Sequence, residues 1–201
     1  MHRISTVLII TALTLGLPLL AAAHDGDIDK VNGAVHIAGG AVVDKASTVN
    51  GSVELGDKAQ ASEVGTVNGS ISLGNGSHVG GVVDAVNGSI HLAPGADVGG
   101  KLSNVNGAIV LDDAHVAGGI GTVNGDITVG ADSHVEGGIL VDKPGGWFNW
   151  HSHTPLVVIG PHAVVQGTLE FRREVVLKVS DSAQIGPVKG ATVVKFSGAQ
   201  P

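Results

Sequence analysis

The sequence predicts an all-β, single-domain protein built as a three-sided parallel β-helix, or β-solenoid. One observation is a Val-Asn-Gly motif that returns every 18 or 19 residues. A second is the glycine content, 32 of 201 residues, with only 2% aromatic residues. The third is a finer rhythm of aliphatic residues about every six positions. Self-similarity at a fixed period is the signature of stacked repeats. The motif asparagines are Asn32, Asn50, Asn68, Asn87, Asn106 and Asn124.

The first 23 residues are predicted to be a signal peptide rather than part of the fold. Met1 to Arg3 carry the positive charge, Val7 to Leu20 form a short apolar run, and Ala21 to Ala23 supply small residues for cleavage. Cleavage after Ala23 leaves a mature chain that begins at His24. We therefore expect an exported, periplasmic protein with no transmembrane anchor after cleavage.

One coil of the predicted helix is visible between Val67 and Ala85, where "VNGSIS", "LGNGSH" and "VGGVVDA" follow one another. Each unit opens with an aliphatic residue and carries a small or β-branched residue four positions later. An amphipathic α-helix needs apolar residues at i, i+3, i+4 and i+7 and does not tolerate such frequent glycine. Three short strands per coil, with coils stacked about 4.8 Å apart, fit the pattern.

Glycine is expected to turn the chain at three corners of each coil. The first corner is Asn-Gly, as in Asn50-Gly51 and Asn68-Gly69, where both residue types tolerate positive φ. The second is Leu-Gly or a variant, and the third is often Gly-Gly. The valine of each Val-Asn-Gly motif is predicted to fill the core. These valines are Val31, Val49, Val67, Val86, Val105 and Val123.

Residues just before each inward aliphatic position are expected to form three outward columns, one per face. The first column is predicted to be Thr48, Thr66, Ala85, Asn104 and Thr122. The second is Glu54, Ser72, His91, Val110 and Thr128. The third includes His78, Asp97, His115 and His134, whose imidazoles, about 5 Å apart, could share Zn or Cu. The alternative is that polar residues simply suit an exposed column.

The predicted β-helix domain covers residues 24–198 in roughly eight coils, with a loop insertion at about 142–155 and a tail at 199–201. The insertion is predicted to contact a partner, a cell-wall glycan or an envelope protein. Its candidate contact residues are Trp147, Phe148, Trp150, His151 and His153. The alternative is that the aromatic residues fold back and cover a coil edge.

Charge and composition exclude several function classes. The net charge is −7, and it becomes −8 when residues 1–23 are removed because they contain Arg3 and no acidic residue. A nucleic acid or anionic lipid partner would need a basic stripe. The chain has no cysteine, so it has no disulfides. No nucleophile triad, paired-carboxylate motif or phosphate loop is present, and we therefore expect neither enzyme activity nor a cofactor.

The units "LGNGSHVGGVV" and "IGPHAVVQGTLEF" resemble those of bactofilins, the polymer-forming β-helical scaffold proteins of bacteria. The resemblance covers roughly residues 31–198 and implies a right-handed helix without enzymatic activity. Hexapeptide-repeat acyltransferases, which form left-handed helices, share the degenerate pattern, but their strict three-by-six period does not accommodate the 19-residue coils. The signal peptide and the aromatic insertion depart from the usual bactofilin pattern.

The function expected from these features is that of an exported, non-catalytic structural protein that assembles end to end. A β-solenoid exposes unpaired backbone at both ends, and little in either end of this chain is able to cover a coil. Phe196 is the predicted self-assembly residue. The alternatives are a periplasmic binding module, which would use the aromatic loop or the His/Asp column, and a hexapeptide-type enzyme.

Overall fold

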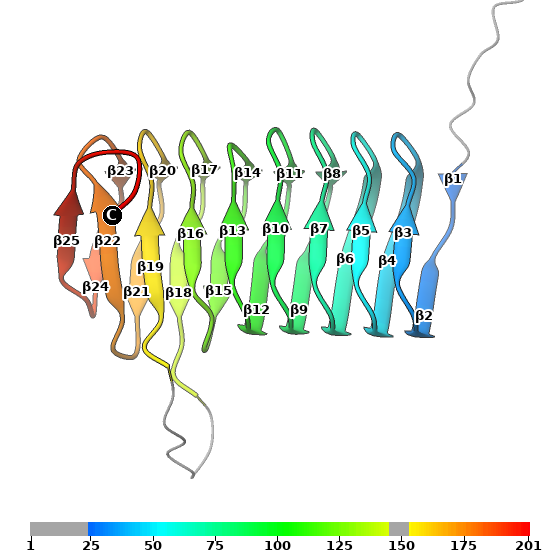
Figure 1. The fold of residues 1–201 in the computed structure, drawn as a ribbon, viewed down its shortest axis with the longest axis horizontal. Coiled ribbons are helices and arrows are strands. Elements are labelled where there is room, and N and C mark those ends of the chain that lie inside the picture. The colour runs from blue at the N-terminus through cyan, green and yellow to red at the C-terminus, as the bar shows by residue number, and fades with distance from the viewer. Residues whose placement is uncertain (1–23, 145–152) are drawn as a thin grey trace, which may run out of the picture.

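Stacked parallel strands make up the whole of the described structure, a computed structural model that covers residues 24–144 and 153–201 (Figure 1). No helix occurs in these two ranges. Each coil contributes one short strand to each of three faces, and equivalent strands of successive coils pair in parallel. The predicted three-sided parallel β-helix is confirmed.

The strands of each face follow one another along the stack. The first face, which leads into the Asn-Gly corner, contains β2 (Ile28–Asn32), the later parts of β4 (Val42–Asn50) and β6 (Gln60–Asn68), β9 (Val83–Asn87), β12 (Leu102–Asn106), β15 (Ile120–Thr122), β18 (Ile139–Val141), β21 (Leu169–Phe171) and β24 (Val188–Lys189). The second face contains β3 (Val35–Ile37), β5 (Val53–Leu55), β7 (Ile71–Leu73), β10 (Ile90–Leu92), β13 (Ile109–Leu111), β16 (Ile127–Val129), β19 (Leu156–Ile159), β22 (Val176–Ser180) and β25 (Val193–Phe196). The third face contains β1 (His24–Asp25), the first parts of β4 and β6, β8 (His78–Val79), β11 (Asp97–Val98), β14 (His115–Val116), β17 (His134–Val135), β20 (Val164–Val165) and β23 (Gln184–Ile185).

Each face of the described chain therefore has nine strand positions. They make eight complete coils, counted from β2, with β1 before them and β24 and β25 after them. In the first two coils, which follow an 18-residue repeat, the third corner is short, and β4 and β6 continue around it as single nine-residue strands. From β8 onward a glycine-containing corner separates the third and first faces. The predicted count of about eight coils is confirmed.

The handedness of the coil follows from the path of the chain in Figure 1. The second face is in front, and its strands point upward. The chain crosses the top, descends on the two faces behind, and advances from β1 on the right toward β25 on the left. Ascending in front while advancing to the left describes a right-handed helix. The predicted hand is confirmed, and it is the hand that parallel strand connections nearly always take.

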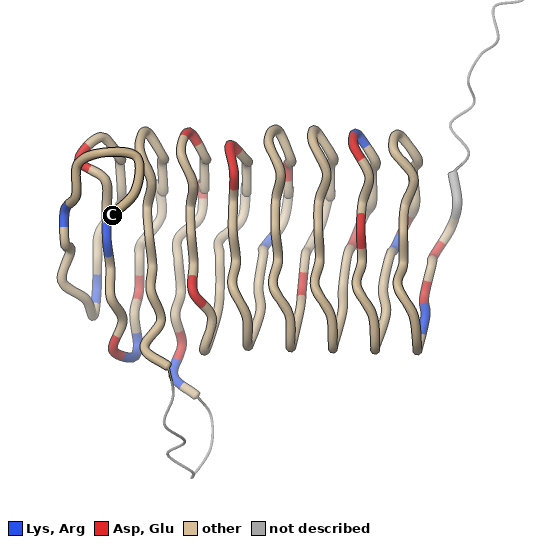
Figure 2. The backbone as a smooth tube through the Cα atoms, viewed as in Figure 1, with Lys and Arg blue, Asp and Glu red and all other residues tan. Residues whose placement is uncertain are grey.

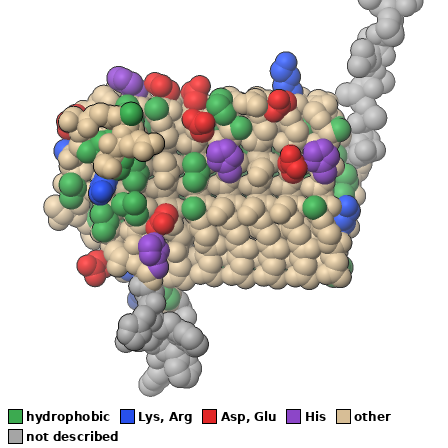
Figure 3. All heavy atoms as spheres, viewed as in Figure 1, with side chains coloured by type: hydrophobic (Ala, Val, Ile, Leu, Met, Phe, Trp, Pro, Cys, Tyr) green, Lys and Arg blue, Asp and Glu red, His purple; other side chains and the backbone are tan. Residues whose placement is uncertain are grey.

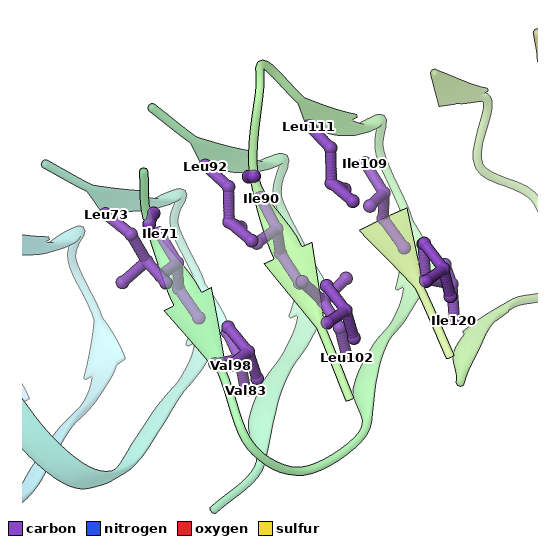
Figure 4. Close-up of a cluster of buried hydrophobic side chains, with 14 of the residues drawn as sticks. Ile71, Leu73, Val83, Ile90, Leu92, Val98, Leu102, Ile109, Leu111 and Ile120 are labelled. Atoms are coloured by element: carbon purple, nitrogen blue, oxygen red, sulfur yellow. The ribbon is translucent and has the colours of Figure 1, made fainter. Parts of the chain in front are cut away.

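Aliphatic side chains fill the interior in stacked layers (Figure 4). In the coil that contains β9 and β10, the inward residues of those strands are Val83, Ala85, Ile90 and Leu92, all of which are buried. The same positions in the next coil are again buried, so each layer covers the one before it. This stacking supplies the apolar burial that one coil alone could not.

The prediction that the motif valines fill the core is wrong. Val31 is 67% exposed, and Val67 is 39% exposed. Strand alternation explains the error, because Val64 and Thr66 face inward and the residue after Thr66 must face outward. The affected valines are Val31, Val49, Val67, Val86 and Val105, which are exposed, and Val123, which is half-buried.

The first outward column was consequently predicted with the wrong orientation, and all five of its residues are buried. They are Thr48, Thr66, Ala85, Asn104 and Thr122. Thr48, Thr66 and Asn104 donate to backbone oxygens at the first corner; Thr48 Oγ1 donates to Gly33 O at 3.0 Å and Thr66 Oγ1 to Gly51 O at 2.9 Å. Thr122 Oγ1 donates to the side-chain oxygen of Asn104 at 2.6 Å. Buried hydroxyls that are hydrogen-bonded in this way are tolerated in a core.

The prediction that the first corner uses positive φ is confirmed for glycine, at Gly33, Gly69 and Gly107, but not for asparagine. None of the motif asparagines has positive φ. A second reason for glycine is that successive coils approach so closely that a Cβ on Gly51 would overlap the carbonyl oxygen of Gly33, and one on Gly69 would overlap that of Gly51. Glycine is required here by backbone proximity between coils.

Candidate functional site

Acidic and imidazole side chains form a continuous ladder on the third face, at the positions predicted as the third column. Asp97 pairs in register with His78 on one side and His115 on the other. Its carboxylate lies 2.6 Å from His78 Nδ1 and 2.5 Å from His115 Nδ1. His115 Nε2 lies 3.1 Å from a carboxylate oxygen of Glu136.

The ladder continues to His134, whose ring lies 5.7 Å from that of His115 between centroids. The amide of Gln166 donates to His134 Nε2 at 3.0 Å. Sequence reasoning therefore predicted the four main residues correctly as neighbours on one face. It missed Glu136 and Gln166, which stand two positions after His134 and Val164 and reach back along the face.

The hydrogen bonds shift the protonation of two members of the ladder. The bond to Asp97 raises the pKa of His115, and the bond to Glu136 adds to this effect against the opposing influence of burial. Burial, the largest single influence on Asp97, raises its pKa, but the hydrogen bonds and charges of His115 and His78 together lower the pKa below its ordinary value. The ladder therefore favours a protonated His115 beside an ionised Asp97.

Zinc or copper binding by this column remains a prediction. No group of three or more His, Cys, Asp or Glu side chains in residues 24–144 and 153–201 is arranged to hold a metal ion. Both carboxylate oxygens of Asp97 and both ring nitrogens of His115 engage neighbouring side chains. A metal would have to replace these hydrogen bonds, since a ligating nitrogen must be unprotonated.

A second ladder, of asparagine side chains, runs along the first corner. From Asn50 onward, the amide nitrogen of each motif asparagine donates to the side-chain oxygen of the asparagine one coil earlier, at 2.9–3.1 Å. In Figure 3 this corner is the even tan strip along the lower edge of the stack. The asparagine ladder comprises Asn32, Asn50, Asn68, Asn87, Asn106 and Asn124.

Arg173 ends the asparagine ladder. Its guanidinium Nη1 donates to the side-chain oxygen of Asn124 at 2.6 Å and to Val123 O at 2.9 Å, and its Nη2 donates to His153 O at 2.9 Å. The arginine is 49 residues from Asn124 in the chain. Nothing in the local sequence indicated this contact, because it depends on the corner two coils away.

The insertion predicted at about 142–155 falls at this same corner, between the end of β18 and the start of β19. Asp126, which directly follows the last Asn-Gly, accepts a hydrogen bond from Leu156 N at 2.8 Å and lies 2.8 Å from His153 Nε2. Of the predicted partner-contact residues, His153 thus belongs to the base of the insertion. The others, Trp147, Phe148, Trp150 and His151, lie outside the described residues.

Both ends of the stack present unpaired strand edges among the described residues. At the N-terminal end these are β1, β2 and β3, and at the C-terminal end they are β23, β24 and β25. Apolar residues of the last coil are only half-buried, among them Val188 and Val193. The C-terminal residues 199–201 do not cover this edge, because they lie against the second face beside Val110 and Val158.

Each end also places a lysine at a position that faces the core in the neighbouring coil. Lys30 stands in register with the buried Thr48, and Lys195 with the buried Val179. The Lys30 ammonium donates to Ala34 O at 2.7 Å, and the Lys195 ammonium to Ser180 O at 3.3 Å. Inward-facing lysines are a device by which natural sheets control pairing at their edges.

Phe196, the predicted self-assembly residue, is half-buried at the end of β25 and stands in register with Ser180. Sequence reasoning singled out this aromatic residue but missed the two edge lysines. The repeat does contain the signal, since both lysines occupy positions where every interior coil has a buried residue.

No helix in the described part of the chain is long and apolar enough to cross a membrane. Comparison with known proteins found no matching family model, no matching curated protein and no matching solved structure.

Proposed function

We propose that the mature chain is an exported, non-catalytic structural protein that assembles end to end into rods in the cell envelope. The observation that carries this proposal is the state of the two ends, where strand edges on all three faces are left unpaired among the described residues. An unpaired edge of a parallel stack is a template for another chain with the same spacing. The partner of the protein is then a second copy of itself.

The rest of the molecule supports a structural role. The interior is filled by aliphatic side chains, and the sides are fixed by two side-chain ladders that cross several coils. Such a body is stiff along its axis, because each coil is hydrogen-bonded to both neighbours. The resemblance to bactofilin repeats points the same way.

Export rests on the order of charge, apolar residues and small residues in positions 1–23. Mass spectrometry of protein recovered from the periplasmic fraction should find an N-terminus at His24. A soluble form that retains Met1 would contradict export with cleavage at this site.

Electron microscopy of the purified mature protein, residues 24–201, tests the assembly directly. Rods of constant width and variable length are expected. Phe196→Asp should shorten them or abolish them, because it adds a charge to the terminal coil. Val86→Asp is the matched control, since Val86 is 40% exposed on the side of the stack. A protein that stays monomeric at high concentration would refute the proposed function.

A further inference from the structure

The two ends of the stack are complementary to each other rather than to themselves. The C-terminal end stops after the first and second faces, at β24 and β25, and its last strand on the third face belongs to the coil before, β23. The N-terminal end begins with a third-face strand, β1, which pairs with β4 ahead of the first complete coil. One end lacks the strand that the other end has in excess.

From this arrangement we infer that copies join head to tail, so that the N-terminal end of one copy continues the coil that the C-terminal end of the previous copy leaves incomplete. The inference rests on the proposed end-to-end assembly and adds its direction. With nine strand positions on every face, β1 of the next copy takes the place that follows β25. The joined molecules form one uninterrupted right-handed helix with no gap and no overlap.

Register predicts which residues meet at such a joint on the first face. Along this face Val188 continues the inward column of Leu169, and Lys189 continues the outward column of Glu170. At the other end, Ile28 and Asp29 hold the same inward and outward columns beside Ala46 and Ser47. A continuous helix therefore places Val188 against Ile28 and Lys189 beside Asp29 of the next copy. Gly190, which has no side chain, then stands in register with Lys30 of the next copy.

Charge complementarity selects the same pairing. Residues 24–30 contain three aspartates and one lysine, and the chain contains no acidic residue after Asp181 but has Lys189 and Lys195 there. Figure 2 shows acidic residues near the start of the described chain and basic residues in the last coil. A joint between two C-terminal ends would bring Lys189 and Lys195 near their own copies. Like charges at an interface disfavour that partner.

The position of Lys195 also favours the head-to-tail joint over a joint between two C-terminal ends. It stands in the inward column of the second face, just before the second corner. Asp25 stands in register with Val43, on the third face just after that corner. In a head-to-tail joint these two register positions become neighbours in one coil. This joint therefore brings a lysine position beside an aspartate position, whereas a joint between two C-terminal ends would not.

Cysteine cross-linking tests the direction, since the natural chain contains no cysteine. Along the second face Val194 continues the outward column of Lys178, and His36 begins it at the other end. Strand neighbours about 4.8 Å apart are within disulfide range. Mature protein with both His36→Cys and Val194→Cys should give a ladder of oxidised oligomers. Each single variant alone should give none, and an equimolar mixture of the two should give dimers.

A charge exchange supplies an independent readout by sedimentation. Lys189→Asp and Asp29→Lys should each raise the concentration needed for assembly about tenfold, and the double variant should restore it. Disulfide dimers of a single-cysteine variant, in protein that still forms rods, would overturn the head-to-tail inference and leave end-to-end assembly standing. Protein that never assembles would overturn both.

Discussion

The coils from β4 to β15 and the C-terminal coils from β18 onward share the same backbone path, but different side chains stabilise their first corners. From β4 to β15, the inward residues at this corner are small or polar, and Thr66 and Thr122 form hydrogen bonds with its backbone. On the outside of the same corner, the asparagine ladder links one coil to the next. From β18 onward, the same inward position holds Val141 and then Phe171, and the ladder ends at Arg173.

This difference shows where the repeat can accept an interruption. The insertion lies at the first corner where the position of the motif asparagine, two residues after Val141, holds Lys143. There Asp126 and Arg173, from the corners on either side, hold the base of the insertion and replace the missing rung. The coils from β4 to β15 form the regular part of the stack, and the C-terminal coils contain both the insertion and an unpaired strand edge.

The largest expected effect sharpens the contrast in packing. Val53 and Val193 occupy one inward column, but Val53 is fully buried in the second coil and Val193 is half-buried in the last. Val53→Ala should lower the free energy of unfolding by about 2–3 kcal/mol, because it leaves a cavity, and Val193→Ala by less than about 1 kcal/mol. Urea denaturation of the mature protein measures both. Equal losses would show that the last coil is covered.

The next effect concerns the end of the asparagine ladder. Arg173→Ala should lower the free energy of unfolding by about 1.5–2.5 kcal/mol, because it leaves Asn124 and two backbone carbonyls without their charged donor. Arg172→Ala is the matched control, since its contacts with Glu170 and Asp142 are exposed and are expected to contribute less than about 1 kcal/mol. If the two variants lose the same stability, Arg173 is not the element that closes the ladder.

The histidine ladder should make the middle coils sensitive to pH. The raised pKa of His115 stabilises the fold fully below its ordinary pKa of 6.5, and this contribution is lost as pH rises through the folded pKa. The lowered pKa of Asp97 stabilises the fold above its ordinary pKa of 3.8, and this contribution is lost as pH falls through the folded pKa. Thermal unfolding should therefore show the ladder's full contribution between about pH 4 and pH 6.5.

His115→Gln should flatten this part of the pH profile, because it removes the charge that faces Asp97 and Glu136. His91→Gln, on the second face, should leave the profile as it is in the natural protein. A profile that is unchanged in His115→Gln would show that the hydrogen bonds of the ladder do not contribute to stability.

The smallest expected effect is metal binding by the same ladder. Zn titration of the mature protein, followed by calorimetry, should show weak binding that His115→Ala/His134→Ala removes. The binding should strengthen as pH rises, because the metal must displace protons from the imidazoles. Equal affinity in the natural protein and the double variant would eliminate this column as the metal site.

Periodicity alone predicted the coiled fold, the approximate number of coils and the second and third outward columns, because close packing of identical coils allows few other arrangements. The first column failed because hydrophobicity was given more weight than alternation. Strand alternation that starts from the inward Val64 places Thr66 inward and Val67 outward. A buried threonine is stable only if its hydroxyl is hydrogen-bonded, and the bond of Thr66 to Gly51 is visible only in the structure. Contacts such as Arg173 with Asn124 depend on the stack as a whole and cannot be found by local inspection.

The axial repeat of the assembled rods tests the central claim most directly. Nine strand positions per face, stacked about 4.8 Å apart, give one copy an axial length of about 43 Å. Cryo-electron microscopy of rods formed by residues 24–201 should show this repeat, with every copy pointing in the same direction. A repeat of about twice that length, with alternating orientation, would contradict the head-to-tail joint. The absence of rods would contradict the assembly itself.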